Sequence, residues 1–272
     1  MKLREQTARI LTGIVGIPVV LLMLWLGGWW WRVTLLVLAW AGQLELYRMY
    51  RLRGYRPLYV AGLLLGGLIF VQDVWSLWLP LSLLVFLGML VYVLFKESSD
   101  PLVDTAGTVL GAIYPAYLFF LLYRIRMPSA EAQTQDFWIS VLLFVLVWSV
   151  DIGAYYVGRA FGRHKLFPRV SPGKTWEGAI GGLLAAWLIG SLFRWGWMPF
   201  MTWTEVWVMA LLIGVAGPLG DLVESRFKRA VGIKDSGHIL PGHGGVLDRF
   251  DAMLFVAPLA YLFIRYCTEL WV

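Results

Sequence analysis

Long apolar runs follow one another along this chain, and short charged or Pro/Gly-containing breaks separate them. A helix of about 20 apolar residues spans the ~30 Å hydrocarbon core of a bilayer. The third run is short, and only "QDV" separates it from the fourth. These two runs either form two spans or form one re-entrant hairpin, which would lower the number of spans. On this pattern we expect about nine membrane-spanning helices, at residues 9–27, 29–47, 57–72, 74–95, 104–123, 137–160, 176–195, 203–224 and 250–270.

The composition agrees with this pattern. Of the 272 residues, 60% are hydrophobic and 15% are charged, whereas soluble domains are about a quarter charged. The predicted fold class is therefore an all-α polytopic integral membrane protein. The single cysteine excludes an intramolecular disulfide and a zinc site built from several cysteines. The first apolar run is too long for a signal peptide, and we interpret it as the first span.

The positive charges predict an orientation. With nine spans, 18 of the 23 lysines and arginines fall on the side of the N-terminus and five on the other. Positively charged loops stay in the cytoplasm. We therefore expect a multi-pass protein of the cytoplasmic (inner) membrane with its N-terminus inside. The polar segment Lys234–Asp251, "KDSGHILPGHGGVLDRFD", then faces the cytoplasm.

Asp151 is a carboxylate inside an apolar run, roughly 12 Å inward from Arg159 along a helix. An ionised carboxylate there costs several kcal/mol unless it is paired or hydrated. It either forms a structural ion pair with a lysine or arginine of a neighbouring helix, or lines a wet cavity that opens to the cytoplasm.

A basic loop, "GRHKLFPRVSPGK", precedes a helix that we expect to start near Thr175. Gly173-Lys174-Thr175 resembles part of a P-loop, but Pro168 stands where the P-loop needs glycine and no buried strand precedes it. The loop carries ordinary positive-inside charge, or Lys174 and the helix N-terminus bind anionic oxygens. The next helix carries Gly178, Gly182, Ala186 and Gly190, a small-residue stripe that favours close helix packing.

Two further groups of polar residues follow. Pro218 is expected to kink or break the eighth span, after which one helix face carries Asp221, Glu224, Ser225 and Lys228. This face suits a divalent cation with a phosphate beside it, or is a solvated helix end with internal ion pairs. Asp248 and Asp251 share a face at the start of the ninth helix, behind His243-Gly244-Gly245, where glycine lets backbone approach a ligand.

These carboxylates, surrounding cations and a glycine loop are typical of a site for Mg²⁺ and a polyphosphate. His238 and His243 suggest zinc, but no cysteine lies near them and carboxylates surround them, which favours a hard cation such as Mg²⁺. A nucleotide from the cytoplasm and a lipid from the bilayer are the substrates that this setting predicts.

The segment Ser225–Asp251, "SRFKRAVGIKDSGHILPGHGGVLDRFD", resembles the signature of phosphatidate cytidylyltransferases (CDP-diacylglycerol synthases) of the bacterial type, without a departure. "SPGKTWEG" and "WSVDIGAYYVGRAFG" also resemble segments of these enzymes. The resemblance is close from about Trp148 to the C-terminus, and rests mainly on hydropathy before it.

The resemblance implies an enzyme that joins CTP and phosphatidic acid into CDP-diacylglycerol and pyrophosphate. It also implies Mg²⁺ dependence, a second cation such as K⁺, and a homodimer, with no nucleic acid as partner. The expected regions are 1–136, a scaffold of about five helices that faces lipid or a dimer partner, and 137–272, the catalytic region. The resemblance also implies that the metal-binding aspartates of the family align with Asp221 and Asp248.

The candidate residues follow from the motifs and the resemblance together. Those expected to act in catalysis are Asp221, Asp248, Lys228, Lys234 and Asp235. Those expected to bind the substrate phosphates are Ser171, Lys174, Ser225, Arg229, His243, Gly244, Gly245 and Arg249. The candidate metal ligands are Asp221, Asp248, Asp151, Glu224 and Asp251.

Three other functions fit parts of the sequence. Buried carboxylates and broken helices occur in secondary transporters, although a transporter site lies near the membrane midplane, and here the charges gather at one face. A CTP-dependent polyprenol kinase and a CDP-archaeol synthase resemble parts of the cytidylyltransferase pattern. "PGHGGVLDRFD" favours phosphatidate over both.

Overall fold

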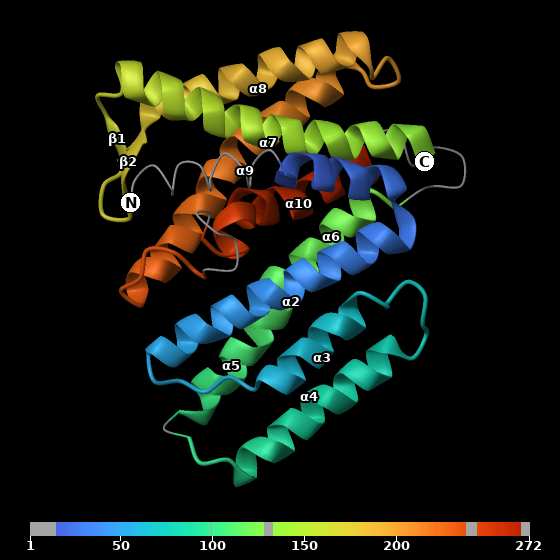
Figure 1. Cartoon of the computed structure of the whole chain (residues 1–272), viewed down its shortest axis with the longest axis vertical. Helices are drawn as coiled ribbons and strands as arrows, with labels where there is room; N and C mark the ends of the chain where they lie inside the picture. The colour runs from blue at the N-terminus through green and yellow to red at the C-terminus, as the bar shows by residue number, and fades with distance from the viewer. Residues whose placement is uncertain (1–14, 99, 128–132, 238–243, 268–272) are drawn as a thin grey trace. The chain divides into compact units, whose positions relative to one another are not determined.

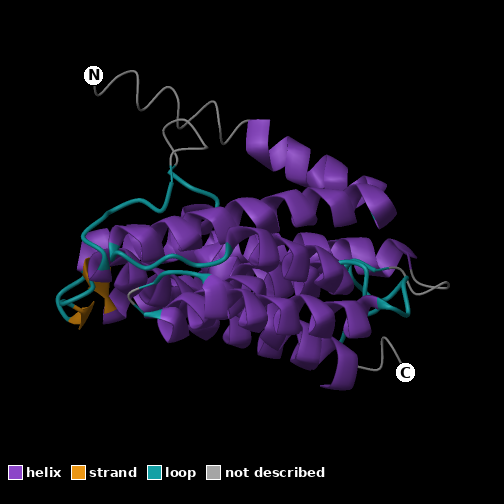
Figure 2. Cartoon of the chain, turned by 90° about the horizontal axis from the view of Figure 1, so that it is seen from below, coloured by secondary structure: helices purple, strands orange, loops and turns teal. Residues whose placement is uncertain are grey.

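The structure is a computed structural model that describes residues 15–98, 100–127, 133–237 and 244–267. Within these ranges nearly all regular structure is helical, and one two-stranded hairpin is present (Figure 2). The predicted all-α class is confirmed. Six helices in the described ranges are long and apolar enough to cross a membrane. The expected count of nine stays a prediction.

The chain divides into two compact units. The first contains Trp29–Tyr123 and Phe227–Arg249, and the second contains Pro18–Gly28, Arg124–Arg226 and the chain from Phe250 onward. The segment Phe227–Arg249, which carries most of the signature motif, thus packs with helices of the first half of the chain.

In the first unit, α2 (Gly28–Leu52) is followed by α3 (Tyr59–Ile69) and α4 (Trp78–Phe95), which lie side by side (Figure 1). The chain then continues through α5 (Pro101–Gly111), a π-helical turn (Ala112–Tyr117) and α6 (Leu118–Ile125). These three elements follow one another directly and form one helical stretch. Pro115 lies in the π-helical turn. Proline has no backbone N–H to donate, and the π-helical turn accommodates the missing hydrogen bond.

Two polar clusters mark opposite ends of this unit. At the start of α2, Arg32 pairs with Asp73 over 2.6 Å, and both side chains are buried. After the other end of α2, the Arg56 N–H donates to Asp104 over 2.5 Å, and Lys96 Nζ lies 3.0 Å from the same carboxylate. The chain from Arg56 to Asp73 therefore runs from one end of α2 to the other. This path favours a crossing over a re-entrant hairpin for α3.

In the second unit, α7 (Gln133–Phe161) leads through strands β1 (Lys165–Phe167) and β2 (Ser171–Thr175) to α8 (Trp176–Gly196). The Thr175 hydroxyl accepts the Gly178 N–H over 3.1 Å and caps α8. The expected helix start near Thr175 is confirmed. The basic loop expected before it includes the short antiparallel hairpin.

The small-residue stripe is confirmed as a packing surface between α8 and α7. A Cβ atom at Gly182 would lie 2.7 Å from the Val150 carbonyl oxygen, and one at Gly178 would lie 2.8 Å from the Ala154 carbonyl oxygen. The two helices can therefore approach this closely only because α8 presents glycine there.

The helices α9 (Trp203–Ala230) and α10 (Leu247–Cys267) each begin in one unit and end in the other. Pro218 lies inside α9 and does not break it, so the expected break is wrong. The helix continues for three turns beyond the proline, which carries Asp221 through Lys228 on one continuous element.

Candidate active site

Asp248 lies in the first turn of α10, where the positive end of the helix dipole favours a carboxylate. Its Oδ2 atom accepts the Ser236 N–H over 2.8 Å, the Ser236 hydroxyl over 2.9 Å and the Gly245 N–H over 2.8 Å. Three donors from the preceding loop thus fix the orientation of this side chain, as the site of a precisely placed carboxylate requires.

The other oxygen of Asp248 accepts a hydrogen bond from Lys228. The Lys228 Nζ atom lies 2.6 Å from Asp248 Oδ1, and the two side chains are 9% and 6% exposed. A buried charge pair of this kind is costly to break, because removal of one partner leaves the other charge uncompensated. The structure therefore brings together two residues that the sequence analysis placed in catalysis.

Glu45 of α2 holds the loop and the start of α10 together. Its Oε1 accepts the Val246 N–H over 2.8 Å, and its Oε2 accepts the Leu247 N–H over 2.9 Å and the Ser236 hydroxyl over 2.8 Å. The side chain is buried. Glu45 therefore caps α10 from another helix and also supports Ser236, which in turn binds Asp248.

Neither Glu45 nor Ser236 is among the residues that the sequence analysis selected. Glu45 carried a signal, because it is a lone carboxylate in an otherwise apolar predicted span, and such residues mark functional sites. Ser236 lies inside the signature motif. The sequence analysis selected the charged residues and glycines around it and did not select this serine.

The two glycines of the loop are required by the carboxylates beside them. Gly244 has a positive φ of +81°, and a Cβ atom there would lie 2.6 Å from Asp248 Oδ2. A Cβ atom at Gly245 would collide with the Ser236 hydroxyl and Glu45. The Gly245 N–H donates to Asp248. The contact of this N–H group with a phosphate oxygen, which the sequence analysis expected, stays a prediction.

A second group of candidates lies in the other unit. Lys174 Nζ lies 2.8 Å from Asp221 Oδ2 and donates to the Pro218 carbonyl oxygen over 3.0 Å. The Ser225 hydroxyl donates to Asp221 Oδ1 over 3.1 Å, as expected for residues four apart on one helix face. The Asp221 side chain is 38% exposed. It is thus more open to a ligand than Asp248.

Asp151 of α7 belongs to the same neighbourhood. It is exposed, and it interacts electrostatically with Asp221 and with Lys174. Among the described residues it forms no ion pair within 4.0 Å, so the structural ion pair considered for it is not present there. Two carboxylates and one lysine therefore share this neighbourhood.

The remaining candidates are placed as follows. Lys234 and Asp235 are exposed and, with Arg48, line a pocket of about 240 Å³. Arg229 donates to the Ile233 carbonyl oxygen over 2.9 Å. His243 lies outside the described residues. Ser171 begins β2, Arg249 is exposed on α10, Glu224 is buried, and Asp251 is half-buried.

Metal coordination by these residues stays a prediction. Within the described ranges, no three side chains of histidine, cysteine, aspartate or glutamate gather closely enough to hold a metal ion. Asp221 belongs to the second unit and Asp248 to the first, so their joint use of a metal is a prediction as well.

Comparison with known proteins covers almost the whole chain. The sequence model of the cytidylyltransferase family matches residues 7–267. A protein of Synechocystis named phosphatidate cytidylyltransferase is 32% identical, over 95% of this chain and 96% of its own. A protein of Bacillus subtilis with the same name is 33% identical, over 96% and 98%. A third, of Staphylococcus saprophyticus, is 35% identical, over 92% and 96%.

The match extends beyond the segment on which the sequence resemblance rested, since it includes α2 to α6 as well as the region after Trp148. The first half, where Glu45 lies, is therefore part of the family's fold. The chain belongs to the cytidylyltransferase family, as its signature segment predicted.

Proposed function

We propose that this protein transfers CMP from CTP to phosphatidic acid, giving CDP-diacylglycerol and pyrophosphate, in phospholipid biosynthesis. The observation that carries the proposal is the match, over more than nine-tenths of both chains, to relatives that bear the name phosphatidate cytidylyltransferase. The two lysine–aspartate pairs, Lys228–Asp248 and Lys174–Asp221, support it, because they combine carboxylates with cations that suit phosphates.

In this reaction, an oxygen of the lipid phosphate attacks the α-phosphorus of CTP in line. A new P–O bond forms, the bond between the α-phosphorus and its bridging oxygen breaks, and pyrophosphate leaves with that oxygen. The attacking group is already an anion, so no strong general base is needed. Catalysis then consists mainly of positioning and charge neutralisation.

The lysines are suited to neutralise phosphate charge. Lys174 and Lys228 each carry one ammonium group that contacts a carboxylate over 2.8 Å or less. An ammonium group has three donors, so each lysine can contact a phosphate oxygen while it keeps its aspartate. Lys234, Arg229 and Arg249 are exposed and add positive charge for the triphosphate or the lipid phosphate.

The carboxylates differ in how well they fit Mg²⁺. Asp221 fits, because its side chain is 38% exposed. Each of its oxygens has only one described donor, which is Lys174 for Oδ2 and Ser225 for Oδ1. Asp248 fits less well as a direct ligand, because three donors already contact Oδ2 and Lys228 contacts Oδ1. Asp221 and Asp151 would hold Mg²⁺, Asp248 stays a candidate ligand, and a second cation such as K⁺ would also use carboxylate oxygens.

Bound there, Mg²⁺ would neutralise charge on the phosphates.

We further propose that the N-terminus and the site face the cytoplasm and that the protein forms a homodimer. The distribution of positive charge supports the orientation, because 18 of the 23 lysines and arginines fall on the side of the N-terminus when nine spans are assumed.

The purified protein in detergent, with Mg²⁺ and CTP labelled at the α-phosphate, tests the activity directly. We expect label in the lipid, and pyrophosphate release only when phosphatidic acid is present. A CTP-dependent kinase would instead move the γ-phosphate and leave CDP, and a transporter would release no pyrophosphate. Archaeol-type lipid and phosphatidic acid, supplied in turn, distinguish the two cytidylyltransferase substrates.

A further inference from the structure

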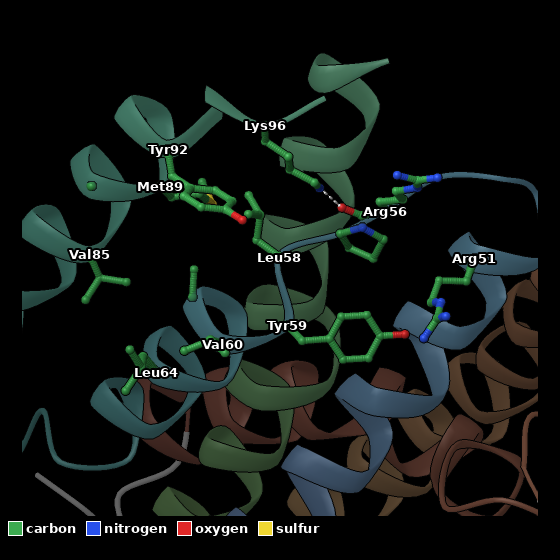
Figure 3. Close-up of a pocket in the computed structure, with 13 residues that line it drawn as sticks. Arg51, Arg56, Leu58, Tyr59, Val60, Leu64, Val85, Met89, Tyr92 and Lys96 are labelled. Atoms are coloured by element: carbon green, nitrogen blue, oxygen red, sulfur yellow. Dashed lines mark hydrogen bonds between the residues drawn. The ribbon is translucent and has the colours of Figure 1, made fainter. Parts of the chain in front are cut away.

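A large cavity lies in the first unit, and none of the residues proposed for catalysis is among those that line it. It has a volume of about 860 Å³ and is lined by residues of α3, α4 and the ends of their flanking segments. Val60 and Leu64 of α3 lie across from Val85 and Met89 of α4 (Figure 3). Gly88 also lines it, and a Cβ atom there would meet nothing within 4 Å. The pocket therefore has long apolar walls and open space between them.

One end of the pocket is basic. Arg51, Arg56 and Lys96 line it there, and no acidic residue is among the lining residues. Lys96 is paired with Asp104 over 3.0 Å. In the part of the chain that the structure describes, neither Arg51 nor Arg56 forms an ion pair, and both are exposed. This end therefore carries positive charge that no neighbouring carboxylate neutralises.

The depth of the pocket corresponds to one leaflet of a bilayer. From Lys96 to Val85 the chain of α4 advances by about 16 Å, at 1.5 Å per residue. Half of the ~30 Å hydrocarbon core is about 15 Å. Only 6% of the α4 span is buried, so the rest of the described chain leaves most of this wall uncovered.

We propose that this pocket binds one anionic glycerophospholipid. Arg51 and Arg56 hold its phosphate, and an acyl chain lies between α3 and α4. Arginine is the residue that best matches phosphate oxygens, through paired N–H donors in a planar fork. The charge and the leaflet depth identify the occupant as a lipid rather than a free phosphate, and the site does not depend on the proposed catalytic reaction.

Photolabelling tests the site in the full-length protein. The probe is phosphatidic acid with a diazirine in its acyl chain, in phosphatidylcholine nanodiscs without CTP, and the labelled residues are mapped by mass spectrometry. We expect labels at Val85 and Met89. Excess unlabelled phosphatidylglycerol should remove them and excess phosphatidylcholine should not. Equal competition by both lipids would overturn the proposal.

A cavity-filling substitution tests the space. Gly88→Trp should fill the pocket, since a Cβ atom there meets nothing within 4 Å, and should lower labelling of Val85 and Met89 by about tenfold, the effect of roughly 1.4 kcal/mol. The matched control is Leu87→Trp, one position along α4 at an exposed site outside the pocket, which should leave labelling unchanged. Equal effects of both would overturn the proposal.

A second variant tests the charge without touching the walls. Arg51→Gln with Arg56→Gln should also lower labelling about tenfold, because charge-assisted hydrogen bonds to phosphate are lost. Arg53→Gln changes an exposed arginine of the same segment that does not line this pocket, and it should leave labelling unchanged.

If a second copy of the chain covers α4 instead, chemical cross-links will join the α4 helices of two copies and lipid labels will be absent, which overturns the proposal.

Discussion

The Glu45 carboxylate accepts the backbone N–H of Leu247 over 2.9 Å, across 202 positions of the chain. The first N–H groups of a helix have no partner inside the helix, and those of α10 find theirs on α2. The Ser236 hydroxyl shares its one hydrogen between the Glu45 carboxylate and Asp248, which also accepts the Ser236 N–H. The geometry of a proposed catalytic aspartate therefore depends on a helix from the first half of the chain.

Glu45→Gln is expected to lower the free energy of unfolding by about 1–3 kcal/mol, because the amide group turns a donor toward N–H and hydroxyl donors that the carboxylate accepts. Formation of CDP-diacylglycerol should fall with it. Thermal denaturation in detergent, followed by tryptophan fluorescence, measures the first effect. Glu97→Gln, at an exposed position in the same unit, is the control and should change neither quantity. Equal shifts in both variants would contradict the role given to Glu45.

Lys228→Met and Asp248→Asn should each destabilise the protein by about 3–5 kcal/mol, since each removes one charge of a buried ion pair. The double variant should lose less than the two single losses together. A double-mutant cycle on thermal stability and on CDP-diacylglycerol formation measures both. Additive losses would show that the two side chains act separately. A loss of activity below about tenfold, or 1.4 kcal/mol, for Asp248→Asn would remove this residue from the proposed catalytic group.

Asp221→Asn should raise the Mg²⁺ concentration needed for half-maximal activity by about tenfold, because a proposed ligand whose side chain is open to solvent loses its charge. Chelation of Mg²⁺ should abolish activity in the unchanged protein, and added Mg²⁺ should restore it. Titration of Mg²⁺ at saturating CTP provides the measurement. Glu205→Gln, at the opposite end of α9, is the control. An unchanged Mg²⁺ requirement in Asp221→Asn would argue against metal binding by this carboxylate.

Gly245→Ala should destabilise the protein by about 1–3 kcal/mol, because its methyl group collides with the Ser236 hydroxyl and Glu45. Gly196→Ala is the matched control, since a Cβ atom at the end of α8 meets nothing within 4 Å. That change should be neutral or stabilise the helix slightly. Comparison of the two denaturation midpoints measures the difference. Similar midpoints would mean that the loop around Gly245 can relax.

Hydropathy predicted most helix positions, because a chain in a bilayer must bond its backbone groups within each apolar segment. Thr175 at the start of α8 and the glycine stripe on its face were also predictable, since capping and close packing depend on local residue type. Pro218 was a local signal for a kink or a break, of which the break is wrong and the kink stays a prediction. Proline favours a kink or a break, but α9 continues through it, packed against α10 at Gly217 and Gly220.

The sequence alone determined the membrane class, the family and the motif that contains Lys228 and Asp248, because these are written in local composition and order. The tertiary structure alone decided which oxygens face which donors. It placed Lys174 against Asp221, paired Lys228 with Asp248, and brought Glu45 to the start of α10. Side chains so far apart in the chain meet only when helices pack, and packing depends on the shapes of whole helix surfaces, which no single motif records.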